Sequence, residues 1–120
     1  MIQAIDHVQV AVPPALEQAA VRFYGGLLGL VRLEKPAGTD DARGAWFQAG
    51  NIQLHVGIQT QGFVAATKAH VAFVVADLDR VKTLLKGDGR PVKDGGGIAG
   101  FRRIFSEDPA GNRLEFLQPA

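Results

Sequence analysis

Residues 5–12 have the sequence IDHVQVAV, in which valine alternates with other side chains, a pattern typical of a half-buried β-strand. Pro13 and Pro14 end this strand, and the apolar spacing over residues 15–28 predicts an amphipathic helix that Gly29 caps. Three more strands are expected over residues 30–35, 44–48 and 52–56, with a polar loop over residues 36–43. The first half of the chain therefore has the predicted order β-α-β-β-β.

The same order of elements returns after a connecting segment over residues 57–68. Residues 69–75, AHVAFVV, predict a strand, and Asp77 is a suitable N-cap for a short helix that ends at Gly87 or Gly89. Three further strands are expected over residues 91–93, 101–105 and 113–117. The second half of the chain thus has the same predicted order as the first.

The two halves also match residue by residue. The segment DHVQV at residues 6–10 matches AHVAF at residues 69–73, and a Gly-Asn turn precedes the last strand of each half. We therefore predict a single α+β domain over residues 1–120 that contains a duplicated βαβββ module. The two modules are expected to span about residues 1–57 and 69–120.

The composition limits what kind of protein this is. The chain is 47% hydrophobic and has a formal net charge of +1, which is too even a balance for an obligate nucleic-acid binder. No apolar run reaches the roughly 18 residues of a membrane-spanning helix and no leader pattern opens the chain, so we expect a cytoplasmic protein without a membrane partner. The lack of cysteine excludes disulfides, thiolate zinc sites and cysteine nucleophiles. The chemistry must come from few groups, among them only three histidines: His7, His55 and His70.

Each module carries polar side chains on the sheet face that its helix is not expected to cover. Residues two apart on a strand share a face, so His7 and His70 each lie opposite apolar neighbours in matching strands. Gln53 and Glu115 hold matching positions in the last strand of each module. Two imidazoles and a carboxylate are ligand types for a divalent ion such as Zn, Ni, Co, Fe(II) or Mn. The competing interpretation is ordinary strand histidines and a solvated glutamate, and the matching repeat positions favour the metal.

Three further side chains are candidates for the same site. Gln53 is the weaker ligand, because an amide oxygen binds metals poorly and this residue could instead form a cross-strand hydrogen bond. His55 lies two residues further along the same face and is predicted to be a pocket residue or an alternative ligand. Trp46 and Phe47 alternate on one strand, so one of them is expected to face the cavity and the other the core; Trp46 is the candidate substrate contact.

Two arginines and a glycine-rich loop complete the candidate residues. Arg102 or Arg103 could hold an anionic substrate group in a bidentate manner, and the alternative is that both are solvated charges at the edge of the sheet. The loop over residues 95–100 matches no phosphate-binding fingerprint, and it is interpreted either as a lid over the cavity or as an ordinary loop.

Four stretches of the chain resemble the vicinal oxygen chelate superfamily, the group of glyoxalase I, bleomycin-resistance proteins and extradiol dioxygenases. They are DHV at residues 6–8, FYGGLLGL at 23–30, HVAFVVAD at 70–77 and DPAGNRLEF at 108–116. The resemblance covers nearly the whole chain. It implies an α+β fold of two tandem βαβββ modules that form a cupped mixed sheet with the helices outside. It also implies a homodimer whose cavities contain residues from both subunits.

The resemblance further implies a divalent metal held by His7, His70 and Glu115, with Gln53 in the place of a fourth ligand. In typical glyoxalase I enzymes this fourth ligand is a glutamate that can act as a base, so the glutamine argues against a two-carboxylate isomerase mechanism. Some members of the superfamily, epimerases among them, carry a glutamine ligand. The sequence leaves open whether the two modules pair within one chain or across a dimer.

The expected function is that of a metal-dependent lyase, isomerase or epimerase that acts on a small oxygenated metabolite. The metal would stabilise an enolate or oxyanion, and Glu115 is the candidate for proton transfer. One alternative is an extradiol-type dioxygenase, because two histidines and one carboxylate also form the facial triad of non-haem Fe(II) oxygenases. Another is a metal-free protein that binds a drug or metabolite, as bleomycin-resistance proteins do.

Overall fold

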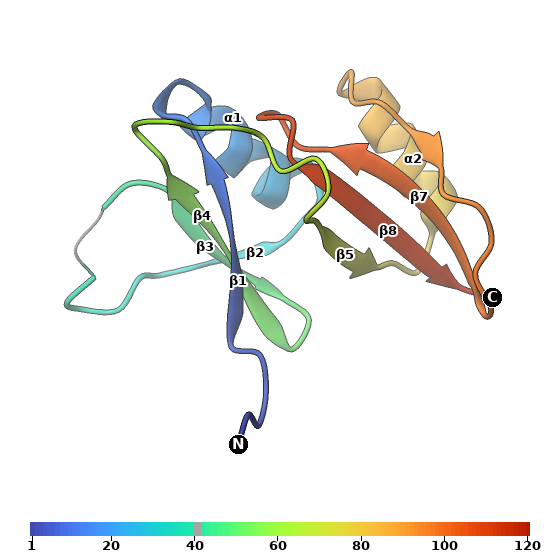
Figure 1. Cartoon of the computed structure of the whole chain (residues 1–120), viewed down its shortest axis with the longest axis horizontal. Helices are drawn as coiled ribbons and strands as arrows, with labels where there is room; N and C mark the ends of the chain where they lie inside the picture. The colour runs from blue at the N-terminus through green and yellow to red at the C-terminus, as the bar shows by residue number, and fades with distance from the viewer. Residues whose placement is uncertain (40–41) are drawn as a thin grey trace. The chain divides into compact units, whose positions relative to one another are not determined.

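The computed structural model describes residues 1–39 and 42–120, and the chain forms two compact units, unit 1 (residues 1–64) and unit 2 (residues 65–120). Each unit contains one four-stranded mixed sheet and its own helical segment (Figure 1). The predicted α+β fold of two tandem βαβββ modules is therefore confirmed. The polar loop predicted over residues 36–43 includes residues 40–41, which lie outside the described residues.

Unit 1 follows the predicted order of elements. Its elements are β1 (His7–Val12), the 3-10 turn η1 (Pro14–Leu16), α1 (Glu17–Val21), the π-helical segment η2 (Arg22–Leu27), β2 (Val31–Leu33), β3 (Ala45–Ala49) and β4 (Ile52–Ile58). The strands are ordered β1-β4-β3-β2, with β1 parallel to β4 and the other pairs antiparallel. The parallel pair joins the first and last strands of the module, so His7 becomes the register partner of Gln53.

The single helix predicted over residues 15–28 is divided into three segments of different winding, η1, α1 and η2. A side chain at Gly25 would place its Cβ 2.9 Å from the Phe47 ring, so glycine lets this part of the helix approach β3 closely. The backbone N–H of Leu28 donates to the Phe23 carbonyl, a bond that spans five residues and is typical of π-helical winding. Gly29 follows with φ +75°, which confirms it as the residue that ends the helix.

The alternating pattern of the strands separates a buried face from an open face in unit 1. The helix-side core contains Val12, Ala20, Phe23, Tyr24, Ala45, Phe47, Leu54 and Val56, each at most 2% exposed. The intervening residues of β1, β3 and β4 point to the other side of the sheet. This open face carries the polar and aromatic residues that the sequence predicted.

Unit 2 repeats the plan with different lengths. Its elements are β5 (Val71–Val74), α2 (Leu78–Gly87), β6 (Lys93–Asp94), β7 (Phe101–Glu107) and β8 (Arg113–Pro119), in the sheet order β5-β8-β7-β6. Asp77 caps α2, since its side chain accepts a hydrogen bond from the backbone N–H of Arg80 at 3.0 Å. His70 was predicted inside the strand and instead lies just before it, because the parallel pairing with β8 begins only at Val71.

A buried aspartate fixes the turn that leads into β8. Asp108 is fully buried, and its carboxylate accepts hydrogen bonds from the backbone N–H groups of Ala110 and Asn112 at 2.8 and 3.0 Å. The side chain of Asn112 accepts in turn from the backbone N–H of Ala66 at 3.0 Å, which ties the start of unit 2 to the turn. These bonds set the register with which Glu115 enters the sheet. None of the helices in the described part of the chain has the length and apolar character needed to cross a bilayer.

Candidate functional site

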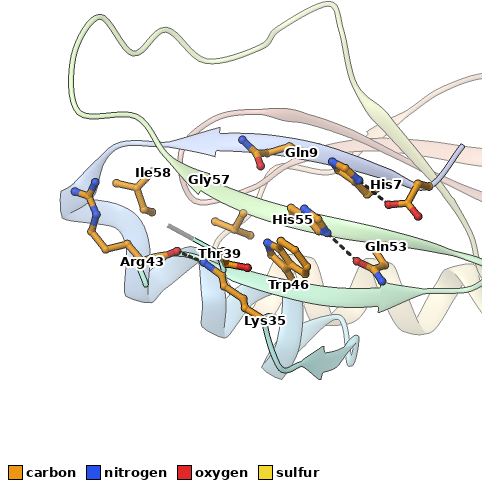
Figure 2. Close-up of a pocket in the computed structure, with 12 residues that line it drawn as sticks. His7, Gln9, Lys35, Thr39, Arg43, Trp46, Gln53, His55, Gly57 and Ile58 are labelled. Carbon is orange, nitrogen blue, oxygen red and sulfur yellow. Dashed lines mark hydrogen bonds and ion pairs between the residues drawn. The ribbon is translucent and has the colours of Figure 1, made fainter. Parts of the chain in front are cut away.

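Three aromatic rings form a stack on the open face of unit 1 (Figure 2). The His55 ring lies between the other two, with its centroid 4.0 Å from the Trp46 ring and 4.1 Å from the His7 ring, and the planes are within 4° and 10° of parallel. Trp46 lies on β3, His55 on β4 and His7 on β1. Trp46 and His55 are register partners, which brings their rings together. The alternation predicted that Trp46 and Phe47 face opposite sides, and the structure puts Trp46 on the open side and Phe47, only 1% exposed, in the core.

The stacked rings line a hollow of about 480 Å³ in unit 1. Gln9 and Gln53 add amide groups to its lining, and Lys35 and Thr39 lie at the side of the Trp46 ring (Figure 2). The hollow therefore combines flat ring surface with hydrogen-bonding groups, which are the usual elements of a small-molecule site.

The hydrogen bonds of the two histidines in unit 1 determine which ring nitrogens carry protons. His55 Nε2 lies 2.9 Å from Gln53 Oε1, and an amide oxygen only accepts, so His55 donates from Nε2. His7 Nδ1 lies 2.8 Å from Asp6 Oδ2 and donates to that carboxylate. Among the described residues, Nε2 of His7 has no hydrogen-bond partner, which leaves a nitrogen lone pair available when the ring is neutral.

His55 is held in its neutral form by its surroundings. The residue is only 4% exposed, and burial is the main cause that lowers its pKa below the ordinary value for histidine. The positive charges of His7 and Lys35 lower this pKa further, whereas Asp6 opposes them. A neutral His55 can keep its hydrogen bond to Gln53 and its place between two rings.

This lowered pKa predicts that acid destabilises the wild-type protein more than a His55→Phe variant. Above the unfolded-state pKa of about 6.5, His55 is neutral in both states and its contribution to stability is fully present. That contribution is lost as the pH falls below this value and through the lower folded-state pKa, because the unfolded chain takes up the proton first. Phenylalanine keeps a ring in the stack and does not titrate. Between pH 7 and pH 5, the free energy of unfolding measured with denaturant should therefore decrease more for the wild type than for His55→Phe. Equal decreases for the two proteins would contradict the prediction.

Unit 2 holds the second pair of candidate residues. His70 Nε2 lies 2.8 Å from Glu115 Oε1, and His70 Nδ1 lies 2.9 Å from the carbonyl oxygen of Lys68. A carbonyl only accepts, so His70 donates from Nδ1 and turns Nε2 toward the carboxylate. The Glu115 side chain is 9% exposed, whereas that of His70 is 26% exposed. The sequence named His70 and Glu115 as candidate ligands at matching repeat positions, and the structure brings these two side chains together within unit 2.

The two arginines considered from the sequence point in opposite directions. Arg103 Nη1 lies 3.5 Å from Glu115 Oε2, and its Nε donates to the Gly95 carbonyl at 2.9 Å. A Cβ at Gly95 would lie 2.8 Å from Cγ of Arg103, so this glycine of the loop makes room for the arginine. Arg102 pairs instead with Asp79 of α2 at 3.2 Å. Of the two, only Arg103 lies beside the candidate ligand.

The candidate ligands form one pair in each unit, and no group of three or more histidine, aspartate or glutamate side chains gathers for a metal within residues 1–39 and 42–120. The chemistry of the donors nevertheless suits a divalent ion. Both His7 and His70 are hydrogen-bonded through Nδ1 to an oxygen, the arrangement that commonly orients a histidine for metal binding through Nε2. Gln53 and Glu115 add one neutral and one anionic oxygen donor.

The sequence matches the family model of the Glyoxalase/Bleomycin resistance protein/Dioxygenase superfamily over residues 4–116. The chain belongs to this superfamily. The match covers both units and confirms the resemblance that the four sequence stretches indicated. A search of curated proteins found no match.

Solved structures of the superfamily have the same fold. A protein of Bacillus anthracis assigned to the glyoxalase family is 39% identical, with a TM-score of 0.88 over 100% of this chain and 98% of the other. A lactoylglutathione lyase from Agrobacterium tumefaciens is 22% identical, with a TM-score of 0.72 over 98% and 94% of the two chains. An antibiotic-binding protein from a Streptomyces species is 19% identical, with a TM-score of 0.78 over 99% and 98%. Proteins described as an enzyme and as a binding protein thus share the superfamily fold.

One residue that the sequence interpretation missed lies next to the pair in unit 2 of this glyoxalase-superfamily chain. The guanidinium carbon of Arg113 lies over the Phe105 ring, 4.0 Å from its centroid, and the His70 ring is nearly perpendicular to the same ring, with the centroids 5.8 Å apart. Arg113 precedes Glu115 by two positions on β8, so both share the open face of the sheet. Residues two apart on a strand share a face, and this rule groups Gln53 with His55 in the sequence. Applied to Glu115, the same rule would have selected Arg113.

Proposed function

We propose that this superfamily member is a divalent-metal-dependent enzyme, a lyase or an isomerase or epimerase, that acts on a small oxygenated metabolite. In this proposal His7 and Gln53 of unit 1 and His70 and Glu115 of unit 2 together hold one ion. The metal is Zn, Ni, Co, Fe(II) or Mn, which are the ions that nitrogen and oxygen donors of this kind accept. Each unit supplies two of the four proposed ligands. We also propose that the chain forms a homodimer.

The observation that carries this proposal is the common orientation of the two histidines. In each unit, Nδ1 of the histidine donates to an oxygen, the Asp6 carboxylate or the Lys68 carbonyl, at 2.8 or 2.9 Å. Nε2 is then the nitrogen that can bind a cation. A surface histidine has no need of this bond, whereas a metal ligand gains a fixed ring orientation from it. Position 69, the match of Asp6, is an alanine, so unit 2 uses a different acceptor for the same bond, and this supports a shared role.

The pair in unit 2 gives a second argument for a cation. Without one, His70 Nε2 and Glu115 Oε1 at 2.8 Å must share a proton, since two lone pairs at that distance repel each other. A divalent cation can replace that proton, which is the usual relation between metal binding and protonation of its ligands. Arg103 near Oε2 keeps the nearly buried carboxylate in position.

Glu115 is the only carboxylate of the proposed ligand set, so it is also the proposed proton carrier. When bound, the ion supplies Lewis-acid stabilisation of negative charge on the substrate oxygens. Glu115 removes or returns a proton at the carbon next to those oxygens. The Trp46 ring and the neutral His55 ring bound the substrate on the unit 1 side and restrict the access of water. Gln53, the weaker of the proposed ligands, transfers no proton, because its amide has no basic group.

Titration of the metal-free protein with Co(II) under anaerobic conditions tests this proposal. We expect saturation at about one ion per chain with the visible spectrum of a nitrogen and oxygen ligand field. Failure to bind Co(II) or Zn(II), together with tight binding of an organic ligand, would favour the metal-free binding protein and contradict the enzyme proposal. Ring cleavage of catechol by the Fe(II)-loaded protein would instead support the dioxygenase.

Mixing of two inactive variants tests the proposed homodimer. If the set is completed across two subunits, a His7→Ala chain and a Glu115→Ala chain regain one intact site when they share a dimer. In that site, unit 1 comes from the Glu115→Ala chain and unit 2 from the His7→Ala chain. We expect the mixture to bind up to about a quarter of the wild-type metal after subunit exchange, since about half of the dimers are mixed and each has one intact site of two. No recovery in mixed dimers of confirmed composition would contradict a shared site.

A further inference from the structure

The open face of unit 2 has a hollow of its own, with a volume of about 360 Å³. Lys93 of β6, Phe105 and Glu107 of β7 and Arg113 of β8 are among the residues that line it. Phe105 is the register partner of both Lys93 and Glu115, so one row of side chains across the sheet connects this hollow with the His70–Glu115 pair. The metal-binding proposal uses none of the charged residues in this hollow.

We propose that Arg113 and Lys93 bind an anionic group of the substrate, a carboxylate or a phosphate. The oxygenated part of the same molecule would lie at Glu115 and His70. This inference names the substrate class of the proposed enzyme and in that sense rests on the proposed function. The substrate is then a metabolite with two polar ends, an oxygenated end for the metal and an anionic end for the arginine.

The position of Arg113 suits recognition of an anion. Its guanidinium carbon lies over the Phe105 ring, 4.0 Å from the ring centroid, and this cation–π contact holds the group in place. The contact uses none of the N–H donors, so they stay available for two parallel hydrogen bonds to a carboxylate or phosphate. The guanidinium carbon of Arg103 lies 5.2 Å from the centroid of the same ring. Arg103 already pairs with Glu115 through Nη1 and donates from Nε to the Gly95 carbonyl.

The charges around the hollow are not balanced by the residues that the structure describes. Arg90, Arg102 and Arg103 of unit 2 each have a carboxylate within 4.0 Å, at 3.4, 3.2 and 3.5 Å. Arg113 and Lys93 have no such ion pair with any residue that the structure describes, although Glu107 is the register partner of Arg113. Two cations and one carboxylate leave one positive charge over the hollow, which suits one anionic group.

Titration of the metal-free protein with inorganic phosphate tests the inference without use of the metal site. Phosphate should shift the amide NMR signals of β6, β7 and the start of β8, and Arg113→Gln should weaken this binding by about 10-fold or more, the effect of a lost charge-assisted hydrogen-bond pair. Lys93→Gln should weaken it less, and Arg113→Lys should restore part of it. The matched control is Arg102→Gln, which removes an arginine that pairs with α2 and should leave phosphate binding unchanged. Equal affinity of Arg113→Gln and wild type, or shifts confined to other parts of the chain, would overturn the inference.

A matched pair of ligands then separates this inference from the proposed function. In the Zn(II)-loaded protein, 2-oxoglutarate should bind about 10-fold more tightly than 2-oxopentanoate, which has a methyl group in place of the distal carboxylate, and Arg113→Gln should remove the difference. If the protein binds no metal and phosphate still binds at Arg113, the proposed function fails and the anion site stands. If metal binds and the two ligands have equal affinity, the anion site fails alone.

Discussion

Replacement of Glu115 or His70 by alanine is expected to weaken Zn(II) binding by about 100-fold to 1000-fold. Structural zinc sites gain about 10–16 kcal/mol from four ligands, so the loss of one ligand costs about 2.5–4 kcal/mol, and each 1.4 kcal/mol is a factor of ten. Oε1 of Glu115 lies 2.8 Å from Nε2 of His70, so these two proposed ligand atoms lie side by side. Competition with a chromophoric chelator measures the affinity.

Two controls belong to this experiment. Glu107→Ala removes a carboxylate from the same face of the same sheet and should leave zinc affinity unchanged, because its register partner is Arg113 and not a candidate ligand. Glu115→Gln keeps the volume of the side chain and should still lose most of the affinity, which separates loss of the ligand from loss of folding. Zinc affinity of Glu115→Gln and His70→Ala equal to that of the wild type would exclude the proposed ligand set.

Replacement of Gly44 by alanine should destabilise the protein by about 2–5 kcal/mol. Gly44 immediately precedes β3 and has φ +75°, which costs an L-residue about 1–2 kcal/mol. Its Cβ would also collide with the backbone carbonyl oxygen of Val56 in β4, which cannot move without breaking the β3–β4 register, and a forced repacking costs about 1–3 kcal/mol more. Denaturant unfolding measures the free energy of unfolding.

The matched control for this variant is Gly50→Ala at the other end of β3. Gly50 also has a positive φ of +63°, but its Cβ would meet nothing within 4 Å. The free energy of unfolding of Gly50→Ala should therefore decrease only by the backbone cost of about 1–2 kcal/mol. Equal losses for the two variants would mean that the contact with Val56 is relieved without cost, which contradicts the tight β3–β4 register on which the Trp46–His55 stack depends.

The sequence was sufficient to predict the faces of the sheets. The period of two in the strands put His7 and His55 on the open side and assigned Trp46 and Phe47 to opposite faces. In the structure one face of each sheet is buried, and it is Trp46 that lies on the open side and Phe47 that lies in the core. The repeat likewise singled out His70 and Glu115 as candidate ligands of the second module, and in the structure His70 Nε2 lies 2.8 Å from Glu115 Oε1.

The contacts that orient these side chains could not be predicted from the strand pattern. That Asp6 and the Lys68 carbonyl fix the two histidine rings depends on side-chain rotamers and on where β5 begins. Arg102 pairs with α2 because of where that helix lies, and Arg103 turns the other way into the space left at Gly95. The close approach of η2 to Phe47 at Gly25 is a tertiary contact, which the helical spacing of residues 15–28 does not reveal.

The metal content of three proteins, wild type, His7→Ala and His70→Ala, shows whether each unit supplies half of the ligands of one ion. We expect about one divalent ion per chain in the wild type and loss of that ion in both variants, although the two histidines belong to different units. Wild-type metal content and affinity in the His7→Ala protein would exclude a metal site made by both units.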